Sequence, residues 1–254
     1  MKKLMSKSAL VTGASRGIGR SIALRLAKDG AVVAVHYGSN AAAAEDTVRE
    51  IRAGGGTAFA VGADLSSVEG IHTLFEALDA SLPEHTGSNR LDIIVNNAGI
   101  GQTLPIEETT EQSLDEVMNL HLKAPLFIIQ QALPRLNDEG RIINISSAVT
   151  RIAFPGLLAY SVSKGAVNTL THVLAQQLGN RRITVNAILP GIIDTEMNAG
   201  MLQNPDGQSF AAGLSTLGRW GQPEDVADIA AFLASPDSRW ITGQLLDASG
   251  GSRL

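Results

Sequence analysis

A glycine-rich turn between a short apolar segment and an amphipathic segment constrains the fold more than any other feature of the chain. Residues 8–11 read S-A-L-V, and residues 12–19 follow at once as T-G-A-S-R-G-I-G. Gly13 permits a tight turn, Gly17 lets a pyrophosphate approach the backbone, and Gly19 allows a helix to pack closely on a strand. The free N–H groups that begin this helix then face the phosphates. The pattern predicts a dinucleotide-binding strand, turn and helix.

Apolar segments alternate with amphipathic ones through the rest of the chain. Strands are predicted at residues 8–11, 31–35, 57–61, 91–95, 141–145, 183–188 and 244–247, and helices at about 40–53, 67–80, 112–136, 157–179 and 223–234. Such alternation predicts an α/β fold, a doubly wound parallel sheet of seven strands with helices on both faces. The length of 254 residues fits one domain, residues 1–254. Residues 83–90 are expected to form a surface loop before the fourth strand.

The end of the second predicted strand indicates which nicotinamide cofactor the turn accepts. An NAD site usually places an acidic residue there, on the ribose 2′-hydroxyl. Here residues 36–40 read H-Y-G-S-N, and no acid follows until Glu45. A 2′-phosphate would meet no repulsion, and Arg16, Ser39 and Asn40 could bind it. NADP(H) is therefore favoured over NAD(H).

Tyr160 and Lys164 stand four residues apart, and Ser147 lies thirteen residues before the tyrosine. Positions i and i+4 share a helix face, so the phenol and the ammonium point into the same space. A phenol has a reference pKa of about 10, and a nearby cation moves that pKa toward the range of general acid–base catalysis. Ser147 supplies a hydroxyl beside the same oxygen. The spacing alone also arises by chance, but together with the dinucleotide turn it predicts a site that protonates a carbonyl oxygen.

With these motifs the chain resembles the short-chain dehydrogenase/reductase family over nearly its whole length. It also carries the family's Asp64-Leu65, the N-N-A-G segment 96–99, and Pro190-Gly191 followed by Thr195. The resemblance implies a Rossmann-type fold. Within the family the chain looks most like the 3-oxoacyl-thioester (acyl-carrier-protein) reductase group.

The resemblance also implies roles for single residues. Tyr160 should be the acid/base, Ser147 should hold the substrate oxygen, and Lys164 should bind the nicotinamide ribose and lower the tyrosine pKa. Asp64 should contact the adenine, and Asn186 should border the nicotinamide pocket. The expected cofactor-binding residues are Gly13, Ser15, Arg16, Gly17, Ile18, Gly19, Tyr37, Ser39, Asn40, Asp64, Leu65, Asn97, Ala98, Gly99, Tyr160, Lys164, Pro190, Gly191, Ile193 and Thr195.

His121 is a departure from the family pattern. Alignment of residues 120–124, L-H-L-K-A, puts it where the family usually has an asparagine that holds a water between the lysine and solvent. Asn119 lies about 200° away around an α-helix and should face elsewhere. An imidazole can donate and accept, so His121 could hold the water or replace it as a fourth catalytic residue. Alternatively, it only packs or caps locally.

Composition excludes several classes of protein. The residues are 44% apolar but only 4% aromatic, so the core should be aliphatic, and a net charge of −5 argues against nucleic-acid binding. No cysteine is present, which excludes disulfides and thiolate metal sites and fits a cytoplasmic location, and the five histidines show no metal-ligand spacing. Residues 1–7 resemble the start of a signal peptide, but a strand follows directly. No apolar run reaches the roughly 18 residues of a membrane span.

Residues 190–220 contain many glycines and several large apolar side chains, which favours a substrate lid over a satellite of the core. The predicted helix at 157–179 carries more apolar positions than one buried stripe needs. Family members commonly pair the helices that correspond to residues 112–136 and 157–179 and also pack around the last strand, so we expect a homotetramer, with a dimer as the alternative. The family's carrier-protein reductases dock with basic residues. Arg181-Arg182 are kept here, but residues 137–139 read N-D-E, which predicts that free carbonyl compounds serve at least as well as carrier-bound ones.

The leading functional prediction is an NADPH-dependent carbonyl reductase that transfers hydride to a hydrophobic or 3-oxoacyl-like ketone. The alternatives are an alcohol or sugar dehydrogenase that runs in the other direction, and a cofactor-binding protein with little turnover. Only His121 favours the last of these.

Overall fold

A single parallel sheet organises the computed structural model, which describes residues 2–254. Its strand order is β3-β2-β1-β4-β5-β6-β7, and every neighbouring pair is parallel. The strands are β1 (Ser8–Val11), β2 (Val32–Tyr37), β3 (Thr57–Gly62), β4 (Leu91–Asn96), β5 (Leu136–Ile145), β6 (Thr184–Pro190) and β7 (Leu245–Ala248). The order reverses between β1 and β4, and the carboxyl ends at such a reversal form a binding crevice. The predicted doubly wound fold is confirmed.

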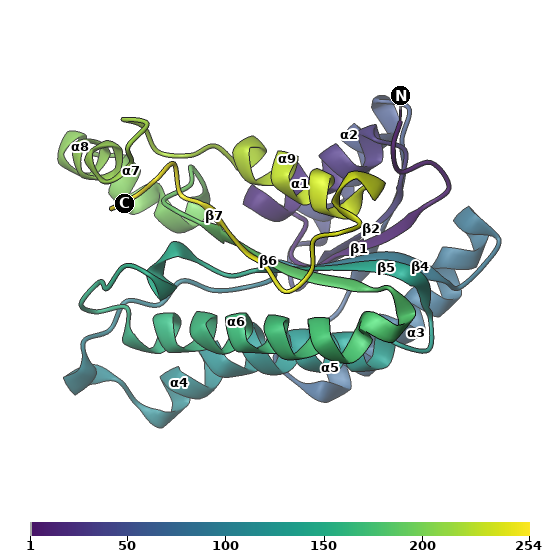
Figure 1. The fold of residues 1–254 in the computed structure, drawn as a ribbon, viewed down its shortest axis with the longest axis horizontal. Coiled ribbons are helices and arrows are strands. Elements are labelled where there is room, and N and C mark those ends of the chain that lie inside the picture. The colour runs from purple at the N-terminus through teal and green to yellow at the C-terminus, as the bar shows by residue number, and fades with distance from the viewer. Residues whose placement is uncertain (1) are drawn as a thin grey trace.

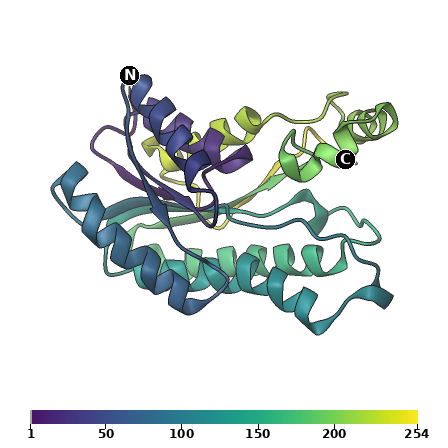
Figure 2. The same ribbon diagram turned by 180° about the vertical axis from the view of Figure 1, so that it is seen from behind.

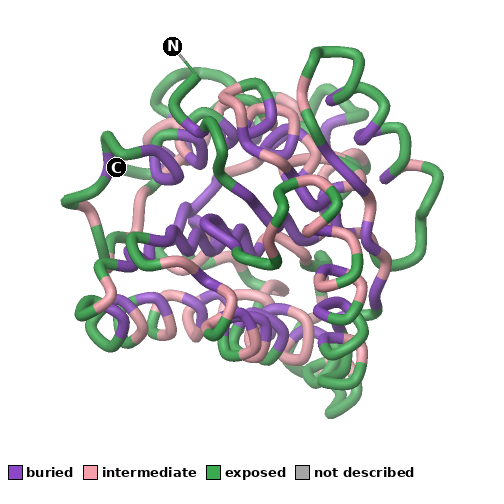
Figure 3. The backbone as a smooth tube through the Cα atoms, turned by 90° about the vertical axis from the view of Figure 1, so that its right-hand side faces the viewer, coloured by how far each residue is buried: buried purple, intermediate pink, exposed green. Residues whose placement is uncertain are grey.

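Helices cover both faces of this sheet (Figures 1 and 2). On one face lie α1 (Gly17–Lys28), α2 (Ala41–Ala53) and α9 (Pro223–Ala234), and on the other lie α3 (Val68–Thr86), α4 (Glu111–Met118), α5 (Ala124–Ala132) and α6 (Leu158–Leu178). Each face has its own buried, mostly aliphatic core. Buried residues gather along the strands and on the inner sides of the helices (Figure 3). No described helix is both long and apolar enough to cross a membrane.

The predicted loop at 83–90 is wrong in its first half, because α3 continues to Thr86. Leu82 is 1% exposed and anchors the last turn in the core, which outweighs the poor helix propensity of Pro83. The helix ends where Gly87 takes a φ of 72° and donates its N–H to the Pro83 carbonyl at 2.8 Å. The burial of Leu82 therefore accounts for a helix that ends later than the sequence predicts.

The predicted helix at 112–136 is also wrong in detail. It consists of α4 and α5 with a π-helical turn between them, η2 (Asn119–Lys123), and α5 ends at Ala132. β5 then begins at Leu136, where it pairs with Leu91 before its register shifts. Residues 137–139 are polar, so the sequence pattern did not indicate that the strand begins this early.

Residues 190–220 are more regular than the sequence suggests. They contain α7 (Ala199–Leu202) and α8 (Pro205–Leu214), which project beyond the carboxyl end of the sheet beside the C-terminus (Figure 1). The described chain also forms short 3₁₀ turns at η1 (Ile106–Glu108), η3 (Ala148–Thr150), η4 (Gly179–Arg181), η5 (Glu196–Asn198) and η6 (Pro236–Ser238).

Candidate active site

The glycine turn after β1 leaves an open cradle at the start of α1. Gly13 and Gly17 take φ values of 62° and 54°, which side chains other than glycine adopt with strain. A Cβ at Gly19 would lie 2.3 Å from the Gly13 carbonyl oxygen, so only glycine fits there. A Cβ at Gly17 would lie 3.2 Å from the Thr195 methyl group, so Thr195 lies over the turn. The residues present fit a pyrophosphate held between the turn and Thr195.

The segment after β4 braces this turn. The Asn97 side chain donates to the carbonyls of Thr12 at 2.9 Å and Gly13 at 3.1 Å. The Thr12 hydroxyl accepts the N–H groups of Asn97 at 2.9 Å and Ala98 at 3.0 Å. These bonds hold Asn97 and Ala98 against the glycine turn.

His36 braces the turn from the other side, and sequence reasoning missed it. Its Nδ1 accepts the Gly13 N–H at 3.1 Å, so Nε2 carries the proton and donates to the Ala63 carbonyl at 3.1 Å. Burial lowers the pKa of His36 to about 4. The only signal in the sequence is a polar residue at the end of an apolar strand.

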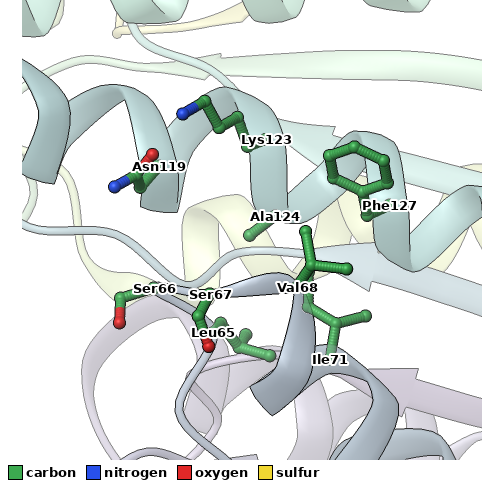
Figure 4. Close-up of a pocket in the computed structure, with 9 residues that line it drawn as sticks. All are labelled: Leu65, Ser66, Ser67, Val68, Ile71, Asn119, Lys123, Ala124 and Phe127. Atoms are coloured by element: carbon green, nitrogen blue, oxygen red, sulfur yellow. The ribbon is translucent and has the colours of Figure 1, made fainter.

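Leu65, which follows the predicted adenine contact Asp64, lines a cavity of about 150 Å³. Asp64 accepts the Ser66 N–H at 2.9 Å, which holds the pKa of its carboxyl below the usual value, and Leu65 is buried. Asn119 lines the cavity from η2 (Figure 4), whereas His121 bonds to Ser163 and Ile100. The described lining residues are Leu65, Ser66, Ser67, Val68, Ile71, Asn119, Lys123, Ala124 and Phe127.

The residues expected to bind a 2′-phosphate are not all free. Asn40 caps α2, and its carboxamide oxygen accepts the Ala43 N–H at 3.0 Å. Ser39 is exposed, whereas the Tyr37 ring packs on Gly62. Arg16 forms an ion pair with Glu196, whose role the sequence did not indicate. Both side chains are about two-thirds exposed, so water screens this pair and another anion can displace it.

Ser147, Tyr160 and Lys164 converge at the carboxyl end of β5. Tyr160 stands in the first turn of α6, and Lys164 one turn later is 5% exposed. The Lys164 Nζ donates to the Ile145 carbonyl at 2.9 Å and lies 5.7 Å from the centre of the Tyr160 ring. Ser147 follows β5 directly and hydrogen-bonds with the Tyr160 side chain. The three predicted catalytic side chains therefore share one space.

Burial dominates the electrostatics of these groups. It raises the pKa of Tyr160, and the hydrogen bond with Ser147 only partly offsets that shift. Burial also lowers the pKa of Lys164 to about 8. The tyrosine pKa is therefore raised and not lowered as expected, because desolvation of the phenol is the largest cause of its shift. The phenol is protonated at neutral pH, ready to donate.

His121 is buried beside the tyrosine with both ring nitrogens engaged. Nδ1 lies 2.9 Å from the Ser163 hydroxyl, and Nε2 accepts the Ile100 N–H at 3.0 Å. No ring nitrogen remains to hold a water, so the geometry favours the local reading of this residue over the water-holding one.

Pro190 and Gly191, which are expected beside the nicotinamide, lie at the carboxyl end of β6. Pro190 ends β6, and a Cβ at Gly191 would lie 2.9 Å from the Ser249 Cα, so the chain turns closely there. Asn186 does not border this pocket as expected. It is 1% exposed, and its carboxamide binds the Ile241 carbonyl and the Gln244 N–H, which joins β6 to the segment before β7.

The turn that follows Thr195 reaches across to the segment after β4. A Cβ at Gly101 would lie 3.0 Å from the Met197 Cγ. We call residues 195–198 the strap, because they contact the glycine turn at Gly17 and the opposite wall at Gly101. Beyond the strap, Phe154 and Phe210 form an edge-to-face pair with ring centres 6.5 Å apart. The sequence did not indicate this pair; Phe154 lies between Ser147 and Tyr160 in the chain.

Comparisons with known proteins agree with this site. A family model described as enoyl-(acyl carrier protein) reductase matches residues 13–253. A hydroxynaphthalene reductase-like protein of Metarhizium brunneum is 42% identical over 265 residues, covering 99% of this chain and 96% of its own. The angucycline C-6 ketoreductase LanV, solved with bound NADP, has a TM-score of 0.94 at 47% identity over 98% of this chain and 96% of its own. The reductase LugOII, which catalyses keto-reduction at C1 during lugdunomycin biosynthesis, has a TM-score of 0.96 at 46% identity over 99% of this chain and 100% of its own.

The fold and the site define an oxidoreductase in which the glycine turn lies at the same edge of the sheet as Ser147, Tyr160 and Lys164. The chain belongs to the short-chain dehydrogenase/reductase family, as its sequence predicts.

Proposed function

We propose that the protein is an NADPH-dependent reductase of ketones on hydrophobic, aromatic substrates. The observation that carries this proposal is the convergence of Ser147, Tyr160 and Lys164 at the end of the dinucleotide cradle. A protonated phenol and a hydroxyl that meet at one point suit a single substrate oxygen. Such a pair suits C=O reduction better than reduction of a carbon–carbon double bond, in which carbon receives the proton.

Each catalytic group has a distinct task in this proposal. NADPH, held by the glycine turn and Thr195, supplies the hydride when it is bound. Tyr160 donates its proton to the substrate oxygen, and Ser147 holds that oxygen in place. Lys164 keeps its positive charge below about pH 8, where it stabilises negative charge that develops on the phenol. Ser147 and Lys164 are buried and Tyr160 is half-buried, which limits the access of competing water.

The strap and the neighbouring pair of phenylalanines support an aromatic substrate. Phe154, Phe210 and Met197 present two aromatic rings and a flexible thioether, which pack well against flat rings. LanV is an angucycline C-6 ketoreductase, LugOII catalyses a keto-reduction during lugdunomycin biosynthesis, and the Metarhizium relative is named for hydroxynaphthalene. We therefore infer a fused-ring ketone, with residues 190–220 as the lid over it.

A carrier-bound substrate is less well supported. Arg181 pairs with Asp138 at 2.8 Å and Arg182 pairs with Glu139 at 3.0 Å. The charges of the basic segment 181–182 and of the acidic segment 138–139 therefore neutralise each other. No net basic surface is left there for an acidic carrier protein. Free ketones are the better candidates.

A substrate panel tests the proposed function directly. We expect steady-state NADPH oxidation with fused-ring ketones such as tetralones to exceed that with short 3-oxoacyl thioesters in kcat/KM. The same 3-oxoacyl group should react no faster on a carrier protein than on a short thiol. A clear preference for the carrier-bound thioester would overturn the substrate assignment, and oxidation of alcohols without ketone reduction would favour the dehydrogenase alternative.

Arg16 is proposed to select the 2′-phosphate of NADPH. Arg16→Ala should weaken NADPH binding by about 10- to 150-fold, the value of a charge-assisted hydrogen bond, and should leave NADH binding nearly unchanged. Glu196→Gln should tighten NADPH binding by up to about fivefold, because a surface ion pair no longer competes for the guanidinium. Fluorescence titration with both cofactors measures this. Arg20→Ala is the matched control, since Arg20 lies on α1 and pairs with Glu50. Equal wild-type affinities for NADPH and NADH would rule the assignment out.

We also propose a homotetramer in the cytoplasm. Apolar side chains on the outer faces of α4 and α6 are exposed, among them Leu114 at 38%, Leu158 at 44%, Val162 at 53% and Val173 at 57%. A second copy packed on this face would cover them. Light scattering at micromolar concentration should give a tetrameric mass, and Val162→Asp with Val173→Asp should lower it. A monomeric wild type would refute this assembly.

A further inference from the structure

His121 fills a space between three elements that meet at the catalytic tyrosine. Its side chain is 1% exposed, and its ring lies edge to face with the Tyr160 ring, with centres 5.4 Å apart at 87°. The segment after β4 leaves room for it, because a Cβ at Gly99 would lie 2.9 Å from the His121 Nε2. The imidazole and this glycine are therefore fitted to each other.

The hydrogen bonds of His121 fix its tautomer. Nε2 accepts the Ile100 N–H at 3.0 Å, so it carries no proton. Nδ1 therefore carries the proton and donates to the Ser163 hydroxyl at 2.9 Å. That hydroxyl donates in turn to the Tyr160 carbonyl at 2.7 Å. The donors run in one direction, from the segment after β4 through η2 to the first turn of α6.

Protonation of this ring would break the arrangement. A proton on Nε2 would point at the Ile100 N–H, so two donors would face each other. The titratable groups near the ring, Tyr160 and Lys164, are both on α6, and the lysine charge opposes a second positive charge. Burial and Lys164 together lower the pKa of His121 to about 2. The imidazole ring is therefore neutral at every pH at which the enzyme is active.

We propose that His121 is a positioning residue with two separable tasks and carries no proton for Tyr160. Through Nε2 it holds Ile100 and the adjoining Gly101, on which Met197 of the strap packs. Through Nδ1 and Ser163 it holds the turn of α6 that presents Tyr160. The inference rests on the proposed ketone reduction, in which Tyr160 is the proton donor.

Two conservative variants separate the tasks. An asparagine amide reaches about where Nδ1 lies, and a glutamine amide about where Nε2 lies. His121→Asn should keep the bond to Ser163 and lose the one to Ile100, which raises KM for the ketone about tenfold and leaves kcat within about twofold of wild type. His121→Gln should keep the bond to Ile100 and lose the one to Ser163, which lowers kcat about tenfold and leaves KM nearly unchanged.

Ser163→Ala tests the same link from its other end. It should reproduce the kcat loss of His121→Gln, and the double variant should lose no more than either single variant, because both remove one interaction. His172→Asn and His172→Gln are matched controls, since His172 is exposed on the same helix. Equal losses in His121→Asn and His121→Gln, with no split between KM and kcat, would reduce His121 to a packing residue and overturn the proposal.

The pH profile distinguishes positioning from proton transfer. Wild type and both His121 variants should show the same fall in kcat where Lys164 loses its proton near pH 8, and added imidazole should rescue neither variant. Rescue by imidazole, or a shifted pH profile of kcat, would show that His121 transfers a proton and would contradict the proposal.

Nitrogen NMR of the imidazole gives a readout that does not depend on turnover. We expect the neutral Nδ1–H tautomer of His121 from about pH 6 to 9, and the Nε2–H tautomer or an imidazolium would contradict the inference. Failure of the substrate panel with the expected tautomer intact would instead count against the proposed function alone.

Discussion

Tyr160→Phe is expected to lower kcat for ketone reduction by at least about 100- to 10,000-fold, the usual contribution of a positioned general acid. The ring keeps its packing against His121, and only the proton donor is lost. NADPH binding should be retained, because the glycine turn, Arg16 and Thr195 are untouched. Stopped-flow measurement of NADPH oxidation with a fused-ring ketone gives the rate, and fluorescence titration confirms that the cofactor still binds.

The stability of the same variant tests whether the loss of activity comes from a disturbed fold. Removal of a buried hydroxyl with one hydrogen-bond partner should change the melting temperature by only a few degrees. A variant that stays folded, binds NADPH and turns over at nearly the wild-type rate would show that another group donates the proton. Ser147→Ala should lose less activity, since the phenol and Lys164 remain.

The parts of the site that the sequence predicted are those with local causes. Gly13 and Gly17 have positive φ values and Gly19 has no room for a Cβ, requirements that only glycine meets and that therefore appear as a pattern of letters. Tyr160 and Lys164 share one turn of one helix, so their spacing alone places them together. The alternation of apolar segments likewise predicted all seven strands and the layers around them.

The parts that could not be predicted depend on partners distant in the chain. Arg16 pairs with Glu196, which lies 180 residues away, and His121 bonds to Ser163 across 42 residues. Asn40 had the chemistry for a phosphate, but it lies where α2 needed an N-cap. The tyrosine pKa shifted in the opposite direction to the expected one because sequence spacing reports the neighbouring charge and not the extent of burial.

Two buried histidines should make the fold sensitive to mild acid. Burial keeps His36 neutral down to a pKa of about 4 and, with the Lys164 charge, keeps His121 neutral down to about 2, whereas both take up protons near 6.5 when unfolded. Below pH 6.5 the unfolded chain therefore binds more protons, and the free energy of unfolding falls as the pH falls. Above pH 6.5 this contribution to stability is fully present.

The size of the effect follows from the two shifts. One pKa unit corresponds to about 1.4 kcal/mol, so each histidine should lower the free energy of unfolding by about 2 to 3 kcal/mol between pH 6.5 and 4.5, or roughly 5 kcal/mol together. Protonation of the Asp64, Asp79 and Asp225 carboxyls also lowers the free energy of unfolding in acid, but the pKa values of these groups lie below 3.8. The loss between pH 6.5 and 4.5 is therefore assigned to the two histidines. That loss is a large part of the stability of an ordinary domain.

Urea unfolding at a series of pH values measures this loss, and His36→Asn identifies its source. Asparagine keeps an acceptor near Nδ1 for the Gly13 N–H but cannot titrate, so the variant should be less stable at pH 7 and should lose only about half as much on acidification. His172→Asn on the exposed face of α6 should leave the pH dependence unchanged. A wild-type free energy of unfolding that stays constant from pH 6.5 to 4.5 would mean that both histidines become protonated in the folded state, and would contradict the buried, fully bonded environments that the structure gives them.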